Sequence, residues 1–286
     1  MRHLIIATAL AAVAGPLAAQ APDCTLGHLP SNTHEAELFR IRGVSTVFAR
    51  DASPMTLRPG GLVVALEATS LPDIDAATAT PTYCRSGKPP EHVNLLPVLP
   101  RPRLIYGLAD EFTLEVSWVP PVRVDGVKAY LFGVALARTV PLASGLVSVR
   151  GHATFGEIRA PITCTKEQIA DPAGPSECVG AAKPSDDHFK PNSFGADLTY
   201  GWPVGGGKLR PYVGAGVNRL LSRFQVDATD STGFHYDQKV EGNYTRLALF
   251  GGASWYPTPR WGLTGELYAD PGTKMVGRMG VAYGLK

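Results

Sequence analysis

Beyond its first twenty residues, this sequence has no apolar run long enough for a membrane-spanning helix. A spanning helix needs about 20 consecutive apolar residues, so a bilayer would have to be crossed by strands. Charge is also scarce, at 18% of residues with a formal net charge of +2, which argues against a nucleic-acid partner. No CxxC or HxxxH spacing occurs, so we expect no metal and no cofactor.

The N-terminus has the features of an export signal. A short basic start, Arg2 and His3, precedes an apolar run from Leu4 to Ala14, and Ala19-Gln20-Ala21 offers small residues for cleavage. This pattern predicts a secretory signal peptide over residues 1–21, since the apolar run is too short to be an anchor. The rest of the chain is therefore expected to leave the cytoplasm.

Cysteine is rare but even in number, which in an exported chain favours disulfides over metal ligands. Cys164 and Cys178 enclose a short polar loop and are the expected pair. Cys24 with Cys84 would follow by exclusion, although spacing alone does not determine connectivity.

The N-terminal region, residues 22–59, differs from the rest of the chain. Ser31-Asn32-Thr33 can cap a short helix that includes Glu35 and Ile41 and ends at Gly43. The region is interpreted as a plug or a periplasmic extension of a domain that spans residues 60–286.

From Gly60 onward the apolar pattern has a period of two, in segments of about ten residues, which is the length of a tilted membrane-crossing strand. Glycine and proline are abundant, with 31 and 25 residues, and long helical patterns are few. Ten segments are predicted: Gly61–Thr69, Arg101–Leu108, Phe112–Val119, Val127–Arg138, Leu146–Glu157, Phe194–Pro203, Leu209–Leu221, Tyr244–Tyr256, Trp261–Ala269 and Lys274–Leu285.

The lengths of the connections favour a barrel. Counted back from an inward C-terminus, the periplasmic turns are all short, and the long stretches Ser70–Pro100, Ile158–Ser193 and Val226–Asn243 all fall outside. Outer-membrane barrels have this arrangement of turns and loops. The fold class is therefore all-β: a closed antiparallel transmembrane β-barrel of ten strands, or twelve if the N-terminal segment or the Ser70–Pro100 loop adds a pair. A soluble secreted β-sandwich is the alternative, but it does not explain how the loops sort.

One face of each segment suits lipid. Aromatic residues are expected at the periplasmic rim (Trp202, Trp255, Tyr256 and Trp261) and at the outer rim (Trp118 and Tyr130). The side chains assigned to lipid are Phe112, Leu114, Val116, Trp118, Tyr130, Phe132, Val134, Leu136, Phe194, Ala196, Leu198, Tyr200 and Trp202.

The opposite face carries charge and is assigned to the lumen. The predicted lumen-lining residues are Arg101, Arg103, Glu115, Arg150, His152, Asp197, Arg210, Arg246, Glu266 and Arg278. Unpaired buried charge is costly, so the carboxylates should lie against arginines. The arginine excess has two interpretations, either a structural network that plugs the barrel or a lining that favours a small anionic or amphipathic solute. An open lumen would then carry an anion-selective current.

Catalytic patterns are sparse, and no catalytic residue is assigned. Asp186-Asp187-His188 is the strongest candidate, but adjacent loop residues of this kind are more often solvated. Val204–Lys208 has three glycines before a lysine but neither a following Ser or Thr nor a helix, so it is predicted to be a turn.

The signal peptide, the period-two segments and the closing strand resemble those of bacterial outer-membrane β-barrel proteins, over Gly60 to Lys286. In that class the last strand carries an assembly signal that usually ends in an aromatic residue. Leu285, Tyr283 and Val281 fit its spacing, whereas Lys286 departs from it. The cysteine-bearing loop and N-terminal extension also resemble, more distantly, uncharacterised barrels related to the fatty-acid-transporter type.

These features together predict a non-enzymatic protein of the Gram-negative outer membrane. It would be a narrow, porin-like pore, a solute or lipid transporter, or a structural barrel. The resemblance implies outer-membrane lipid and the barrel-assembly machinery as partners. The alternatives are an outer-membrane hydrolase or acyltransferase and a soluble secreted binding module.

Overall fold

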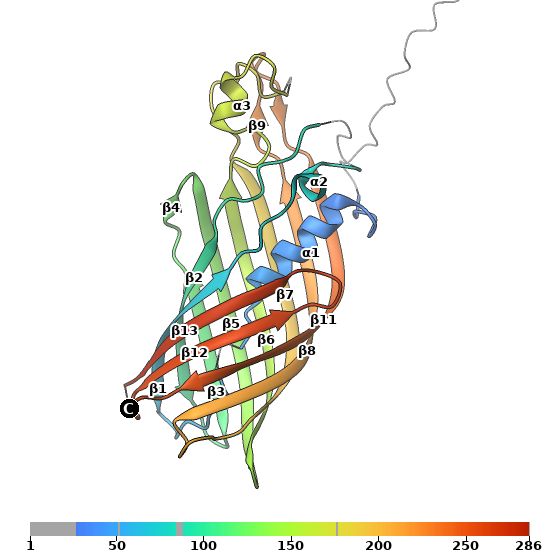
Figure 1. Cartoon of the computed structure of the whole chain (residues 1–286). Coiled ribbons are helices and arrows are strands. Elements are labelled where there is room, and N and C mark those ends of the chain that lie inside the picture. Colours follow the sequence, from blue (N-terminus) through green and yellow to red (C-terminus); the bar gives the residue numbers. More distant parts are fainter. Residues whose placement is uncertain (1–26, 51, 84–87, 176, 286) are drawn as a thin grey trace, which may run out of the picture.

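Ten long strands form a closed antiparallel barrel, as the sequence predicts (Figure 1). The structure is a computed structural model that describes residues 27–50, 52–83, 88–175 and 177–285. Each strand pairs with the next along the chain, and β1 pairs with β13 to close the barrel. The long strands are β1 (Leu62–Ser70), β2 (Val98–Gly107), β3 (Phe112–Val119), β5 (Val127–Leu142), β6 (Gly145–Ala160), β7 (Asp187–Gly201), β8 (Leu209–Gln225), β11 (Lys239–Trp255), β12 (Trp261–Ala269) and β13 (Met275–Gly284).

The two ends of the barrel differ in their connections. At the end near the C-terminus, which we call the short-turn end, β5 and β6 are joined by residues 143–144 and β11 and β12 by residues 256–260. The described parts of the stretches 71–97, 161–186 and 226–238 all project from the opposite end, the long-loop end (Figure 1). These connections carry the short elements α2 (Ala76–Ala79), α3 (Lys166–Ala170), β9 (Ala228–Thr229) and β10 (His235–Tyr236), and β4 (Arg123–Val124) lies in the shorter connection 120–126 at the same end. The long connections therefore all lie at the end opposite the C-terminus, as predicted.

Several strands are longer at the long-loop end than predicted. β7 begins at Asp187 rather than Phe194, and β11 begins at Lys239 rather than Tyr244. Pro191 lies in this extension of β7, and proline has no N–H for a ladder. Pairing of β6 with β7 accordingly skips from the Thr154–Ser193 pair to the Ile158–Phe189 pair. The side chain of Asn192 accepts the hydrogen bond of the Gly156 N–H at 3.1 Å within this gap.

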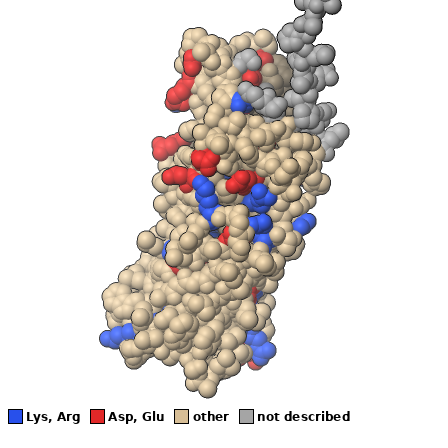
Figure 2. Space-filling view, turned by 45° about the vertical axis from the view of Figure 1, so that its right-hand side comes forward, with Lys and Arg blue, Asp and Glu red and all other residues tan. Residues whose placement is uncertain are grey.

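The exterior has an apolar belt. Exposed belt residues include Phe132, Leu136, Phe194 and Leu198, and the lower part of the molecule in Figure 2 is almost free of charge down to its rim. Aromatic rings lie at the short-turn end, where Tyr200 stacks on Trp202 and Trp261 packs against Tyr283; Trp118 and Tyr130 are exposed near the other edge of the belt. A belt with aromatic girdles is the exterior of a transmembrane barrel.

The polarity of the wall reverses beyond the belt. One row of inward-facing residues, paired across β5, β6, β7, β8 and β11, is apolar, and we call it the apolar rung. The outward residues next to it along these strands are charged: Lys128, Glu157, Arg159, Lys190, Arg223 and Glu241. The inward residues of this rung are Ala129, Ile158, Phe189, Phe224 and Val240. Charged groups accordingly gather across the middle of Figure 2. The extension thus has an apolar interior and a polar exterior, as a water-exposed structure requires.

Helix α1 (His34–Thr46) lies within the barrel and contacts β7, β8 and β11. Thr33 caps it, accepting a hydrogen bond from the Ala36 N–H, as predicted. The prediction that Gly43 ends the helix was wrong, since the helix continues to Thr46. Gly43 instead allows close packing, because a Cβ there would lie 3.1 Å from Leu220 Cδ1.

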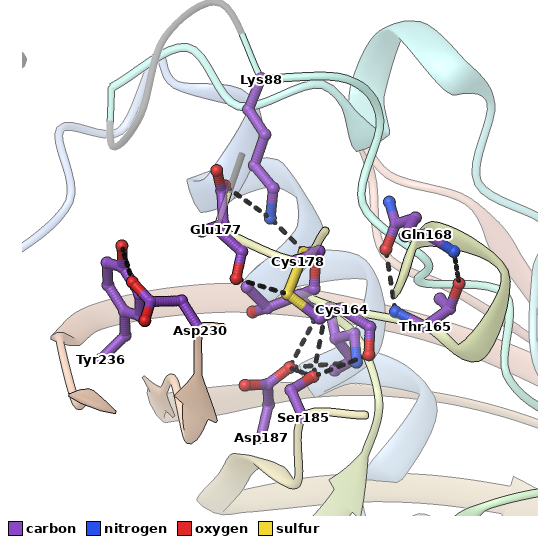
Figure 3. Close-up of a disulfide and its surroundings, with 12 residues drawn as sticks. Lys88, Cys164, Thr165, Gln168, Glu177, Cys178, Ser185, Asp187, Asp230 and Tyr236 are labelled. Atoms are coloured by element: carbon purple, nitrogen blue, oxygen red, sulfur yellow. Dashed lines mark hydrogen bonds and ion pairs between the residues drawn. A yellow bond between two sulfur atoms is a disulfide. The ribbon is translucent and has the colours of Figure 1, made fainter. Parts of the chain in front are cut away.

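A disulfide crosslinks the loop between β6 and β7 at the long-loop end (Figure 3). Cys164 and Cys178 are bonded, as predicted, and are buried with Val226 and Ala228. Cys24 and Cys84 lie outside the described residues. Asp187 anchors the base of the loop, accepting hydrogen bonds from the backbone N–H groups of Thr163 at 2.6 Å and Asp227 at 2.9 Å.

Candidate functional site: the lumen plug and the outer pocket

Residues 28–50 and 52–54 run through the lumen from the long-loop end toward the short-turn end. Near the long-loop end, the Leu29 N–H bonds to the Glu241 carbonyl, and Glu35 accepts hydrogen bonds from Thr82 in the 71–97 loop. Further along, the Ser53 N–H donates to Ser254 Oγ near the end of β11. We call the buried part of this segment, Val47 to Arg50, together with α1, the plug.

Arginines of the wall hold the carboxyl end of α1. Arg101 donates to the carbonyls of Thr46 at 2.8 Å and Val47 at 3.2 Å. Arg150 donates to the Phe48 carbonyl at 2.9 Å, and Arg103 donates to the Ala49 carbonyl. The last turn of α1 contains no basic residue, so the wall supplies the positive charge that stabilises a helix C-terminus.

The Phe48 ring lies among the same guanidinium groups. Its centroid is 4.3 Å from Arg103 Cζ, 4.9 Å from Arg150 Cζ and 5.6 Å from Arg101 Cζ. The side chain is fully buried. Cations within about 6 Å of a ring face are attracted by its quadrupole, and more strongly where water is absent.

Carboxylates of the wall pair with these arginines. Arg150 lies 3.2 Å from both Glu115 and Asp197, and Arg278 lies 3.1 Å from Glu266. Arg103 also pairs with Glu67. Five buried arginines (Arg50, Arg101, Arg103, Arg150 and Arg278) face four buried carboxylates (Glu67, Glu115, Asp197 and Glu266). Plug carbonyls and the Phe48 ring take up the remaining positive charge.

The structure places the predicted lumen residues in two groups. Arg101, Arg103, Glu115, Arg150, His152, Asp197, Glu266 and Arg278 are buried inside the barrel. Arg210 lies near the short-turn end beside the Tyr256 ring, and Arg246 pairs with Asp270 near the long-loop end; both are only half-buried. Sequence reasoning missed Glu67 and Arg50. Glu67 lies on the inward phase of β1 and could have been found there, whereas Arg50 lies outside the strands.

An apolar pocket of about 180 Å³ lies at the long-loop end, between α1 of the plug and the part of the barrel wall that extends beyond the belt. The apolar rung described above forms its back, while Leu38 and Phe39 of α1 and Leu95 and Leu96 of the 71–97 loop form its other sides. A change in residue type along β6 marks this pocket in the sequence. The inward positions of β6 change from Arg150 and His152 to Ile158 and Ala160.

Arg42 is the arginine of the pocket lining. Burial lowers the pKa of Arg42 to about 10, so it stays protonated at neutral pH. Its guanidinium donates to the carbonyls of Pro72 and Val93 and to Asn94 Oδ1. Arg42 therefore binds the 71–97 loop to the helix and closes this side of the pocket.

Polar groups gather at the outer end of the pocket, near the disulfide. Lys88 donates to the Thr163 carbonyl at 3.1 Å and to Glu91 at 2.8 Å, and Figure 3 shows it reaching toward Glu177 and the disulfide loop. The Asp187 carboxylate links the disulfide loop to the 226–238 stretch by accepting hydrogen bonds from the N–H groups of Thr163 and Asp227. The adjacent Val226 N–H donates to the Gln238 carbonyl at 2.9 Å. Thr163, Gln238 and Glu91 all line the pocket.

The side chains of Asp186, Asp187 and His188 do not converge. Asp186 faces Arg123 at 3.3 Å, and Asp187 is buried and accepts hydrogen bonds from backbone N–H groups and Ser185. His188 Nδ1 lies 3.3 Å from Glu157. Among the described residues there is no group of His, Cys, Asp and Glu able to hold a metal ion, and the same residues contain no helix long and apolar enough to span a membrane. Val204–Lys208 forms a turn with positive φ at Gly205, Gly206 and Gly207.

Comparisons with known proteins return solved structures only, since no family model and no curated protein matches. The translocator domain of the autotransporter NalP from Neisseria meningitidis is 12% identical with a TM-score of 0.34, covering 85% of this chain and 93% of that one. Ail, the attachment invasion locus protein of Yersinia pestis, is 11% identical with a TM-score of 0.30, covering 79% and 98%. Neisserial surface protein A is 14% identical with a TM-score of 0.27, covering 78% and 96%.

The chain's own architecture defines its class. Ten strands close on themselves, and no open edge strand remains in the barrel wall that the structure describes. The apolar belt faces outward between aromatic rims, while charge is enclosed within. This protein is an outer-membrane β-barrel by fold.

Proposed function

We propose that this protein is a non-enzymatic barrel of the Gram-negative outer membrane that binds an elongated apolar or amphipathic molecule in its outer pocket. The observation that carries the proposal is the apolar rung of Ala129, Ile158, Phe189, Phe224 and Val240, which encloses a cavity against α1. Ligand sites are typically concave and apolar with a few placed polar groups. The long loops would face outside, and a signal peptide over residues 1–21, which lie outside the described residues, would direct export.

A closed lumen supports this function over that of an open pore. The arginines that could attract an anionic solute already donate to plug carbonyls and pair with carboxylates. A solute would have to displace these buried interactions, each of which is costly to break. The separate structural partners of Asp186, Asp187 and His188 support the absence of catalysis at that motif.

Binding of an apolar fluorophore tests the proposal. The purified protein in a non-fluorescent detergent is titrated with N-phenyl-1-naphthylamine, whose emission rises in an apolar site. Wild-type protein should bind it saturably. Ala129→Phe fills part of the pocket and should lower the affinity, whereas Ala196→Phe places the same side chain on the lipid face and should not.

A second variant guards against misfolding of the first. Leu95→Glu places a charge at a half-buried position of the pocket lining and should weaken binding without filling the core. Heat-modifiable migration on gels reports whether each variant is folded. Equal binding by wild type, Ala129→Phe and Leu95→Glu would overturn the proposal, as would the absence of saturable binding by folded wild-type protein.

A further inference from the structure

Beyond the outer aromatic rim, the exterior of the barrel places cations directly opposite one another. Lys128 of β5 lies across from Arg159 of β6, and Lys190 of β7 lies across from Arg223 of β8. All four point outward, because the residues that alternate with them line the outer pocket inside the wall. Like charges directly opposite each other on neighbouring strands are destabilising, so an anion bound between them would stabilise this part of the wall.

The carboxylate nearest to these cations does not compensate all of them. Glu157 binds Arg159 at 2.7 Å, lies 3.3 Å from His188 Nδ1 and lies 4.0 Å from Lys190 Nζ. One carboxylate thus faces three basic side chains. Lys128, beside them, makes no ion pair within the part of the chain that the structure describes. This surface therefore has cationic charge to spare.

Lys128 and Arg159 border an open hollow of about 250 Å³ on the outside of the wall, and Pro121, Tyr130 and Glu157 complete its lining. The Arg159 guanidinium donates to Glu157 through Nε at 2.7 Å, so the carboxylate fixes its orientation. The Lys128 and Arg159 side chains start from facing positions of a strand pair, about 5 Å apart at their Cβ atoms. The hollow therefore presents an ammonium group and a guanidinium group together.

The hollow lies at the depth of lipid head groups. Tyr130, Phe132 and Phe155 are exposed on the same two strands, on the side of the apolar belt. Successive outward positions along a strand are roughly 7 Å apart, so Lys128 lies about one such step beyond Tyr130 and the outer edge of the belt. The head-group layer on each side of the hydrocarbon core is roughly 5–8 Å thick. Lys128 and Arg159 consequently lie within this layer.

We propose that the hollow binds the phosphate group of a lipid in the outer leaflet, with the lipid's acyl chains lying over Tyr130, Phe132 and Phe155. Phosphate is the anionic group that bilayer lipids carry at this depth, and basic side chains near the membrane surface bind it. A guanidinium group matches the geometry of phosphate oxygens, and an ammonium group adds a point charge. The site lies on the opposite side of the wall from the outer pocket and does not depend on the ligand of that pocket.

Trp118 provides a local reporter for this lipid. It is exposed on β3 directly across from Phe132, whereas the other tryptophans of the chain, Trp202, Trp255 and Trp261, lie toward the short-turn end. The protein is reconstituted in phosphatidylcholine vesicles that contain equal fractions of either phosphatidic acid or phosphatidylcholine with brominated acyl chains, which quench tryptophan. The quenching that Trp118→Phe removes measures lipid beside the hollow. Phosphatidic acid should associate there at least ~5-fold more strongly than phosphatidylcholine.

Charge variants locate the phosphate. Lys128→Gln should lower the preference for phosphatidic acid about 5-fold, which corresponds to the contribution of one basic residue near a lipid surface. Arg159→Gln should act in the same direction, and Lys128→Arg should retain the preference. Lys183→Gln removes the same charge from an exposed position of the disulfide loop and should have no effect. Heat-modifiable migration on gels reports whether each variant is folded.

Two results would overturn the lipid site. One is equal quenching of Trp118 by the two brominated lipids in wild-type protein. The other is a preference for phosphatidic acid that survives in folded Lys128→Gln and Arg159→Gln proteins. Inorganic phosphate is the remaining arm of the experiment: if it abolishes the preference at millimolar concentration, the hollow binds free phosphate and the assignment to a lipid is wrong. A preference that persists in inorganic phosphate supports the lipid.

Discussion

Arg150 connects the barrel wall to the plug through one guanidinium group. It donates to the Phe48 carbonyl, lies 3.2 Å from Asp197 on the adjacent β7 and 3.2 Å from Glu115 on β3, and contacts the Phe48 ring. Removing one member of a buried ionic network leaves the others uncompensated, which costs more than the net contribution of the pair. The stability of the plug and that of the wall should therefore depend on the same residue.

We expect Arg150→Met to lower the free energy of unfolding by ~3–5 kcal/mol, because it leaves buried carboxylates short of a partner. The measurement is urea unfolding in lipid vesicles, followed by tryptophan fluorescence. Arg219→Met is the matched control, since Arg219 lies on the exterior and bonds only to Thr245 among the interactions described here, and it should change stability by less than ~0.5 kcal/mol. Equal midpoints for both variants would contradict the network.

Asp230 gives a residue-scale prediction for pH. Hydrogen bonds from Thr232, and further ones from the Phe234 N–H and Tyr236, hold the pKa of Asp230 below its ordinary value. A lowered folded-state pKa means that the turn is stabilised above the ordinary aspartate pKa and loses this contribution as pH falls toward the lowered value. Amide exchange at Thr232 and Phe234, corrected for intrinsic rates, should lose protection only below about pH 4; unchanged protection at lower pH would contradict this role.

At the scale of elements, α1 and the wall are complementary. The helix ends without a basic residue, and strands β2 and β6 supply arginines to its carboxyl end. The fit also depends on small residues of the wall. A Cβ added at Gly133 of β5 would lie 2.8 Å from Phe48 Cγ and 2.4 Å from Ser117 Oγ.

Gly133→Val should therefore displace Phe48 and loosen the plug. We expect planar-bilayer recordings of this variant to show opening events that are absent from wild type. Gly265→Val provides the control, because a Cβ at Gly265 meets no atom within 4 Å. If the folded Gly133→Val protein shows no opening events, the packing of Phe48 against β5 does not hold the plug in place.

The elements differ in how far they could be predicted. The alternation of Phe132 and Leu136 with small inward residues is local, so the strands and the lipid face could be read from the sequence, and the closed barrel confirms them. The predicted bounds of β7 and β11 are too short, because the outward residues of their extensions, such as Lys190 and Glu241, are charged and break the apolar pattern of the lipid face. The course of α1 through the lumen depends on contacts such as those of Arg101, which lie far away in sequence. The resemblance to barrels of the fatty-acid-transporter type stays a prediction.

At the scale of the whole molecule, two zones share one wall. The belt zone encloses charge that holds the plug, and the extended zone encloses an apolar pocket. Sequence reasoning left a plugging network and a solute-attracting lining as alternatives. The contacts of Arg103 and Arg150 favour the plugging network.

Wild-type protein should consequently carry no steady current in planar bilayers at neutral pH, whatever the salt concentration. Buried interactions are little affected by ionic screening, so high salt should not open the lumen. Insertion is checked by protease protection of the barrel in the same lipid. A steady anion-selective current would contradict the closed lumen. It would favour the alternative in which the arginines line a path for an anionic solute.

The passage of residues 28–50 and 52–54 through the lumen also constrains how the barrel assembles. Leu29 pairs with Glu241, and Ser53 bonds to Ser254, although roughly two hundred residues separate each pair along the chain. Contacts so distant in sequence form slowly, because the entropy of closing long loops must be lost first. A short stretch, residues 55–61, joins the plug to β1, and β1 pairs with β13 to close the ring. We therefore expect insertion of the plug and closure of the barrel to be linked steps of assembly.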